Sequence, residues 1–122
     1  MAPGRRQLLG ALGEQLALEH YERLGFRALS RNYRTRGGEI DLVVSDGAVT
    51  VFVEVKTRRC GGLDPMLAIT APKRRRMRSL AAAWLVDHPH RVRTARLRLD
   101  AVGIVLDERD RLVALEQLED VA

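Results

Sequence analysis

The sequence predicts a single mixed α/β domain in which helices pack against a β-sheet. Three observations indicate this fold class: two segments with helical spacing of apolar residues, several segments in which apolar residues alternate, and the order of these segments along the chain. The chain has 122 residues, and 46% of them are hydrophobic, which suffices for one core but not for two full folds. We therefore expect one domain over residues 1–122, with its core from about residue 8 to residue 106.

The first half of the chain predicts a helix over residues 7–24 and a short strand over 26–29. Gly25 follows the helical segment and is a residue type that commonly ends helices. The stretch 31–38 is polar, basic and glycine-containing, so we expect a loop there. The apolar stripe of the helix consists of Leu9, Leu12, Leu16 and His20.

Residues 39–44 and 49–56 are predicted to form a β-hairpin, because apolar residues alternate in both segments. Asp46-Gly47 between them is typical of a tight two-residue turn. This register pairs Ser45 with Ala48, Asp41 with Phe52, and Glu39 with Glu54. One predicted face is aliphatic and consists of Ile40, Leu42, Val44, Val49, Val51, Val53 and Val55. The other face carries Glu39, Asp41, Phe52, Glu54 and Lys56.

The second half predicts an irregular segment over 57–71, a helix over 71–87, a strand over 96–106 and a short strand over 112–115. Thr70 and Pro72 are typical of the start of a helix, as a cap and an early helical proline. The apolar stripe of this helix consists of Met77, Leu80, Ala81, Trp84 and Leu85.

The composition restricts the classes of function. The net charge is +5, and 19 of the 21 basic residues are arginine, whose forked side chain suits phosphate oxygens. A GC-rich genome would also favour arginine codons, so the ratio alone does not identify a partner. The sequence contains no run of 18 apolar residues, so no membrane span is predicted. A single cysteine excludes an internal disulfide framework. We expect a reduced, cytoplasmic protein.

The polar face of the hairpin brings acidic residues close to a lysine. Asp41 and Glu54 are predicted to be diagonal neighbours, with Lys56 two residues from Glu54 on the same face. Carboxylates crowded in this way repel one another unless a cation lies among them. Oxygen ligands favour Mg²⁺ or Mn²⁺, and such a site has the equipment for phosphodiester hydrolysis. The alternative is a solvated strand face on which charges happen to alternate.

Two segments together resemble the core of the PD-(D/E)xK nucleases. They are Gly38-Glu39-Ile40-Asp41-Leu42-Val43 and Phe52-Val53-Glu54-Val55-Lys56-Thr57-Arg58. From about Leu8 to Leu106 the chain is similar to the YraN family of small bacterial proteins, which is related to archaeal Holliday-junction resolvases and has no firmly assigned substrate. The resemblance implies a restriction-endonuclease-like mixed β-sheet flanked by helices, Mg²⁺ or Mn²⁺ as cofactor, DNA as partner, and a homodimer by analogy with the resolvases.

The resemblance also implies roles for individual residues. Asp41 and Glu54 correspond to metal ligands, and Lys56 corresponds to the catalytic lysine. The family pattern G-E-x-x-A is matched by residues 13–17, so Glu14 is a further candidate for catalysis and metal binding, the alternative being an ordinary surface glutamate. The proline of the motif name is absent before Asp41. The role of Glu39 stays open, and Asp100 is interpreted as structural, as a partner of an arginine.

Basic residues flank the predicted acidic site in three groups. The candidates for nucleic-acid binding are Arg34, Arg36, Arg58, Lys73, Arg74 and Arg76. The last three lie in the first two turns of the second helix, where the helix dipole already favours an anion, so phosphate is expected there. Contacts of this kind bind the phosphate backbone without reading base sequence. The alternative is a solvated helix face.

The sequence therefore predicts a metal-dependent endonuclease-like protein that binds and hydrolyses DNA, with branched or structured DNA as a candidate substrate. Two other functions stay open at this stage. One is a nucleic-acid-binding module of the same fold without significant catalysis. The other is an adaptor whose basic helix binds an acidic protein partner.

Overall fold

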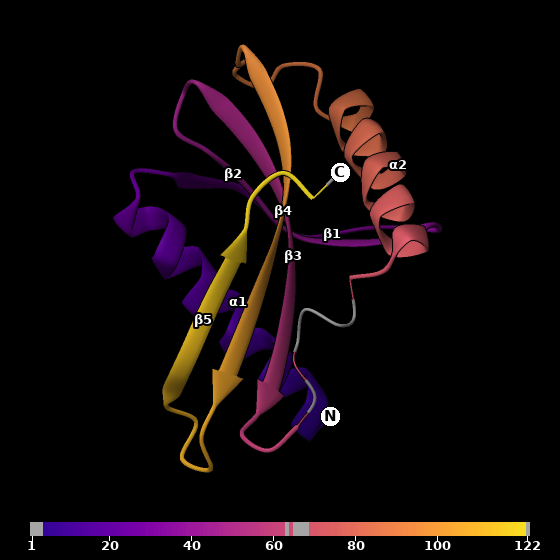
Figure 1. The fold of residues 1–122 in the computed structure, drawn as a ribbon. Helices are drawn as coiled ribbons and strands as arrows, with labels where there is room; N and C mark the ends of the chain where they lie inside the picture. The colour runs from indigo at the N-terminus through magenta and orange to yellow at the C-terminus, as the bar shows by residue number, and fades with distance from the viewer. Residues whose placement is uncertain (1–3, 63, 65–68, 122) are drawn as a thin grey trace.

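The computed structural model describes residues 4–62, 64 and 69–121. They form a mixed α/β fold in which a five-stranded sheet in the order β1-β2-β3-β4-β5 lies between two helices (Figure 1). Strands β3 and β4 are parallel, and all other neighbours are antiparallel. The elements are α1 (Arg5–Arg23), β1 (Arg27–Thr35), β2 (Gly38–Ser45), β3 (Val49–Arg59), α2 (Ala71–Asp87), β4 (Arg96–Leu106) and β5 (Leu112–Leu118). The predicted fold class is confirmed at this level.

Each helix covers one face of the sheet and encloses one apolar cluster. The α1 cluster contains Ala17, Leu18, Tyr21, Leu42, Val44, Val49, Val51, Val53, Val55, Val102, Ile104 and Leu106. The α2 cluster contains Ile40, Val43, Phe52, Met77, Leu80, Ala81, Trp84 and Leu99. The stripe predicted for α2 is confirmed, whereas the most buried face of α1 is centred on Ala17 and Tyr21, and the predicted leucines lie at its margin.

Both helices begin and end for local reasons that the sequence indicates. The Thr70 hydroxyl accepts the backbone N–H of Lys73 at the start of α2, and a proline occupies the first turn. Helix α1 ends at Arg23, and Gly25 follows with φ of 93°, a conformation that glycine adopts without strain. Neither described helix combines the length and the apolarity that crossing a bilayer requires.

The loop predicted over residues 31–38 is wrong, because most of it belongs to strand β1. This strand runs to Thr35 and pairs with β2 through a tight hairpin that places Thr35 opposite Gly38. The segment is polar because much of it faces solvent at the edge of the sheet. The strand predicted for residues 49–56 also continues to Arg59, because β4 pairs with it over its whole length.

The predicted register of the β2–β3 hairpin is wrong, because Ser45 pairs with Thr50 rather than with Ala48. Asp46 lies opposite Val49, so the two-residue loop is Gly47–Ala48 rather than Asp46–Gly47. The Asp46 carboxylate accepts the backbone N–H groups of Ala48 and Val49, and Gly47 has φ of 94°. Because the register differs by an even number of residues, the apolar residues from Leu42 to Val55 keep the faces that the alternation predicts.

Ile40 was expected on the aliphatic face and lies instead in the α2 cluster. The reason is an irregularity shared by β1 and β2. In β1, Arg31 bonds to Gln15 of α1, and Asn32 has the left-handed φ of 53°. In β2, alternation is interrupted between Ile40 and Leu42, which belong to different clusters. This interruption leaves Asp41 at the boundary between the two faces.

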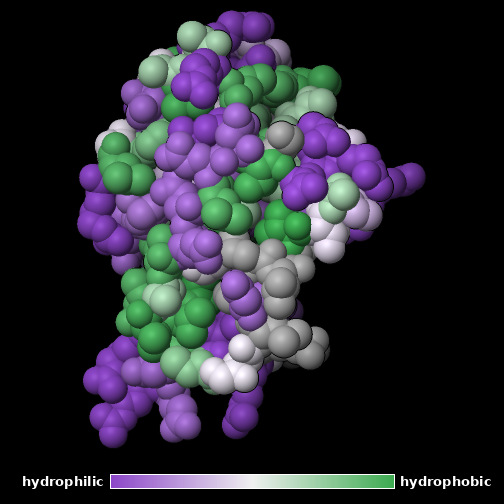
Figure 2. Space-filling model, in the orientation of Figure 1, coloured by the Kyte–Doolittle hydropathy of each residue, from purple (hydrophilic) through white to green (hydrophobic). Residues whose placement is uncertain are grey.

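The outer surface of the sheet and helices is mixed in character. Patches of hydrophobic residues on the visible face are separated by hydrophilic ones (Figure 2). Strand β5 lies at one edge of the sheet and exposes Leu112, Val113 and Leu118. The strand is longer than the 112–115 segment that the sequence predicts.

Candidate functional site

The candidate site lies where strands β2 and β3 separate. Their pairing ends at Leu42 opposite Val53, so Asp41 and Glu54 are the next residues on the two strands. The Asp41 carboxylate accepts the backbone N–H of Val55 at 2.7 Å and thereby replaces a bond between the strands. Asp41 and Glu54 are thus direct neighbours across the gap, rather than the diagonal pair that the predicted register implied.

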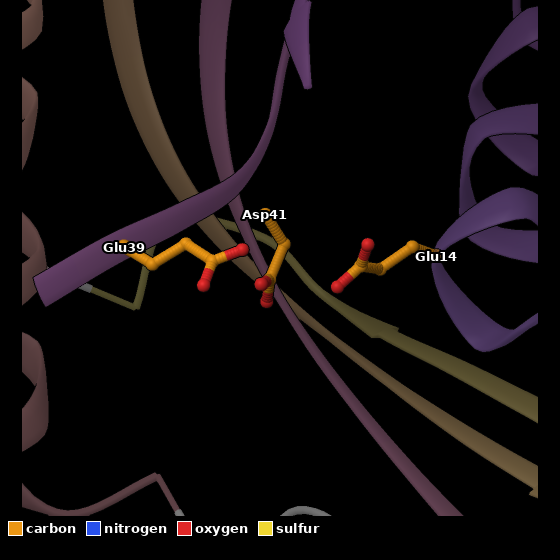
Figure 3. A group of neighbouring side chains, drawn as sticks. All are labelled: Glu14, Glu39 and Asp41. Carbon is orange, nitrogen blue, oxygen red and sulfur yellow. The ribbon is translucent and has the colours of Figure 1, made fainter. Parts of the chain in front are cut away.

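Three carboxylates from two elements converge at this gap. Glu14 of α1 and Glu39 and Asp41 of β2 each offer an oxygen, and these oxygens lie within 4.8 Å of one another. Figure 3 shows Asp41 between the other two, with the carboxylates of Glu14 and Glu39 pointing toward it. We call these three residues the acidic cluster. Sequence reasoning placed Glu14 and Asp41 in the site and left Glu39 open.

Helix α1 approaches β3 closely because Gly13 has no side chain. A Cβ atom at this position would lie 1.8 Å from the Thr57 Oγ1 atom and 2.9 Å from its Cβ. Ala17, one turn further, is also small and is fully buried. The G-E-x-x-A pattern therefore has a physical reason: small residues bring the helix onto the sheet, and Glu14 between them reaches the gap.

The environment of the acidic cluster opposes ionisation. Burial, followed by the negative charge of Glu54, raises the pKa of Asp41 to about 8. Burial and the charge of Glu39 raise the pKa of Glu14. Within the described part of the chain, neither Glu14 nor Asp41 forms an ion pair, which makes the gap attractive to a cation.

Glu54 is neutralised by two lysines. Its Oε1 atom lies 2.9 Å from the Lys73 Nζ atom and 3.5 Å from the Lys56 Nζ atom. Glu54 is buried, whereas the two lysine side chains are about one-quarter exposed. The predicted ligand Glu54 therefore lies beside the acidic cluster, and α2 contributes a lysine that sequence reasoning assigned only to nucleic-acid contacts.

One cavity of about 230 Å³ lies between the sheet and α2 and is lined by Glu39 and Asp41 of the acidic cluster, by Glu54 and by both lysines. The lining residues are Gly38, Glu39, Asp41, Glu54, Val55, Lys56, Lys73, Arg76, Met77 and Leu80. Acidic groups of β2 and β3 therefore face basic groups of α2 across the cavity. The arrangement offers a place for a cation and for a phosphate beside it.

The other predicted basic residues do not line this cavity. Arg34 forms an exposed ion pair with Glu39, with 3.4 Å between the Nε and Oε2 atoms. Arg36 is exposed in the β1–β2 turn, and Arg58 is exposed near the end of β3. Arg74 is half-buried on α2 and does not line the cavity. Only Lys73 and Arg76 of the predicted group reach it.

Two further polar residues, Asp100 and Asn32, differ in their relation to the site. Asp100 is fully buried and is held by Arg98 through two hydrogen bonds of 2.9 Å, which confirms its structural role. Asn32 was missed by sequence reasoning, although its side chain contacts both Glu14 and Glu39. A signal was available: asparagine is one of the few non-glycine residues that adopt left-handed backbone readily.

Comparison with known proteins relates the chain to bacterial proteins of similar length. Residues 13–104, which contain every predicted site residue, match the model of the uncharacterised protein family UPF0102. A UPF0102 protein of Mycolicibacterium vanbaalenii is 42% identical over 96% of this chain and 95% of its own length. One of Geobacter sulfurreducens is 43% identical over 87% of this chain and 84% of its own length. The predicted resemblance is confirmed, and the chain belongs to the uncharacterised family UPF0102, the YraN family.

Proposed function

We propose that this protein is a metal-dependent nuclease of the PD-(D/E)xK type that hydrolyses phosphodiester bonds in DNA. The observation that carries the proposal is the convergence of Glu14, Glu39 and Asp41 beside the Glu54–Lys56 pair, at the point where two strands separate. Four carboxylates gathered where the pairing of two strands ends would not stabilise a sheet that has only a structural role. The resemblance of both strand motifs to that nuclease core supports the same function.

The acidic cluster fits a hard divalent cation. Its donors are carboxylate oxygens from two elements, as Mg²⁺ and Mn²⁺ prefer, and burial together with the negative charge of Glu54 raises the pKa of Asp41. Asp41 and Glu14 would hold the ion, with Glu39 or Glu54 as a further ligand. When bound, such an ion supplies a Lewis acid for a phosphoryl oxygen and lowers the pKa of a water molecule.

The lysines have separate tasks in this proposal. Lys56 lies on the same strand as Glu54 and faces the cavity, so its ammonium group is placed to neutralise charge that develops on a phosphate. Lys73 and Arg76 lie one turn apart on α2 and line the opposite wall. They would hold the phosphate against the acids.

Duplex or branched DNA suits the arrangement of basic residues around the cavity. Arg36 is exposed in the turn before β2, Arg58 is exposed near the end of β3, and Arg74 extends the basic surface of α2. Such contacts supply affinity for a phosphate backbone and depend strongly on salt. Arg34, now paired with Glu39 at the surface, would join them when Glu39 binds a cation.

The proposal is tested by cleavage of labelled duplex, nicked, flap and four-way DNA, with a structured RNA for comparison, in Mg²⁺ or Mn²⁺. The wild-type protein should cleave at least one DNA, and cleavage should stop in EDTA. Asp41→Asn, Glu54→Ala and Lys56→Ala should each lower the rate at least about a hundredfold. DNA binding, measured without divalent cations, should persist in all three.

Glu22→Gln is the matched control, because it makes a similar change on the exposed surface of α1. It should cleave like the wild type. Binding of DNA without cleavage of any substrate would reject catalysis and favour a nucleic-acid-binding module of the same fold. Binding of neither DNA nor RNA would reject both functions and favour an acidic protein partner.

A further inference from the structure

We propose that Asn32 is a positioning residue of the acidic cluster, whose side-chain amide holds Glu14 and Glu39 together. Its nitrogen donates to Glu14 Oε1 at 2.9 Å and to Glu39 Oε1 at 2.8 Å. The opposite amide orientation would direct the Asn32 oxygen at two acceptors, so the hydrogen-bond network fixes the assignment. The inference rests on the proposed function, because it assigns a task in holding the metal ligands.

The backbone conformation of Asn32 also helps to position the acidic cluster. Arg31 lies opposite Leu42 and Tyr33 lies opposite Ile40, which leaves Asn32 across from Asp41. Asn32 has φ of 53°, whereas most non-glycine residues avoid this region. The turn of the chain at Asn32 directs two consecutive side chains of β1 toward α1. The break in alternation that brings Asp41 to Glu14 occurs at the same point of β2.

A neutral donor suits this position better than a cation. The Asn32 amide has two N–H groups, and each can bond to one carboxylate without supplying a charge. An arginine or lysine here would neutralise the acids and compete with a metal ion for them. The amide instead keeps two like-charged groups from separate elements in a fixed orientation, as outer-shell residues do in metal sites.

Asn32→Gly provides the test, because glycine adopts the left-handed backbone without strain and removes the side chain with its amide. Binding of Mn²⁺ by calorimetry should weaken about tenfold to a hundredfold relative to the wild type. The unfolding temperature without metal should change little. Asn32→Ala removes the amide and also strains the backbone, so it should lose a similar factor in affinity and be less stable than Asn32→Gly.

A crystal structure of metal-free Asn32→Gly gives a second readout that needs no metal. The Glu14 and Glu39 carboxylates should move apart relative to the wild-type structure. Unchanged carboxylate positions, or unchanged Mn²⁺ affinity in a folded variant, would overturn the role of Asn32. Failure of the wild type itself to bind Mn²⁺ would instead reject the proposed function, while separated carboxylates in the variant would still support the positioning role.

Discussion

Two aspartates of this sheet, Asp41 and Asp100, have opposite surroundings. Asp100 on β4 is fully buried, and every oxygen of its carboxylate has donors. The donors come from Arg98, Tyr21, Gln117 and the backbone of Asp120. The carboxylate therefore joins α1, β4, β5 and the C-terminal segment. This site is complete without any ligand.

Asp41 on β2 is half-buried, and its neighbours include other acids. It accepts one hydrogen bond from the backbone of Val55, and Glu14, Glu39 and Glu54 surround it. Arg98 balances the charge of Asp100 through paired hydrogen bonds, whereas the lysines near Asp41 contact Glu54. The comparison indicates that the surroundings of Asp100 stabilise its charged form, whereas those of Asp41 oppose ionisation.

The largest effect is expected from Asp100→Ala. It would leave Arg98 and the Tyr21 hydroxyl buried without their partner, and should lower the free energy of unfolding by about 3–5 kcal/mol. Urea denaturation measures this change. Arg111→Ala, which removes an exposed ion pair with Asp107, should cost less than about 1 kcal/mol. Equal effects of the two substitutions would show that Asp100 does not organise the core.

Gly13→Ala should have the next largest effect. The added Cβ would lie 1.8 Å from the Thr57 Oγ1 atom, so α1 must move away from β3, at a cost of about 1–3 kcal/mol in stability. Glu14 moves with the helix, so Mn²⁺ affinity should fall as well. Adding Thr57→Ala should recover part of both losses.

Gly10→Ala is the control for that substitution, because its Cβ would meet nothing within 4 Å. It should stabilise the helix slightly, by roughly 0.5–1 kcal/mol. A Gly13→Ala protein as stable as the wild type, with equal metal affinity, would contradict the role of this close approach.

The stability of the metal-free protein should depend on pH because of Asp41. The pKa of Asp41 is about 8 in the folded protein and about 3.9 in an unfolded chain. The folded state thus binds this proton more tightly, so its stabilising contribution is complete below pH 4 and is lost as the pH rises toward 8. The free energy of unfolding of the metal-free protein should decline across this window by at most about 1.4 kcal/mol per pH unit.

Asp41→Asn should remove this decline and raise the unfolding temperature of the metal-free protein near pH 8. Thermal denaturation of both proteins at pH 5 and pH 8, in the presence of EDTA, measures the difference. Destabilisation by Asp41→Asn at pH 8 would mean that the carboxylate supports the fold as Asp100 does.

The smallest expected effect concerns DNA affinity. Lys73→Ala should weaken binding without divalent cations about threefold to tenfold and reduce the slope of log affinity against log salt by about 1. Arg96→Ala removes a positive charge at the start of β4, where Arg96 pairs with Val49, and should weaken DNA binding less. Equal losses for both variants would indicate non-specific attraction rather than a phosphate site at α2.

Much of the fold could be predicted because local patterns and tertiary structure agree. Helix α2 begins at a threonine cap, and β4 alternates over the predicted residues. Only the first part of β1 lies within the strand predicted over residues 26–29, because an edge strand needs few apolar residues and the polar side chains that follow are typical of loops. The hairpin register was missed because the Asp46 side chain caps the turn and shifts the loop by one residue.

The site was predictable where a motif fixes the residue and unpredictable where two irregular strands meet. Glu14, Asp41, Glu54 and Lys56 were each identified from motifs, and all four lie at or beside the gap. The contributions of Glu39 and Asn32 depend on the interrupted alternation of β1 and β2. A regular period of two cannot anticipate that interruption.

The most direct test of the account is anomalous diffraction from crystals soaked in Mn²⁺. A cation bound by Asp41 together with Glu14, Glu39 or Glu54 is the expected result. The same soak of Asp41→Asn crystals should leave this position without an anomalous peak. If wild-type crystals that are open to solvent at this cavity show no ion at Asp41 under saturating Mn²⁺, the acidic cluster is not a metal site and the nuclease proposal fails.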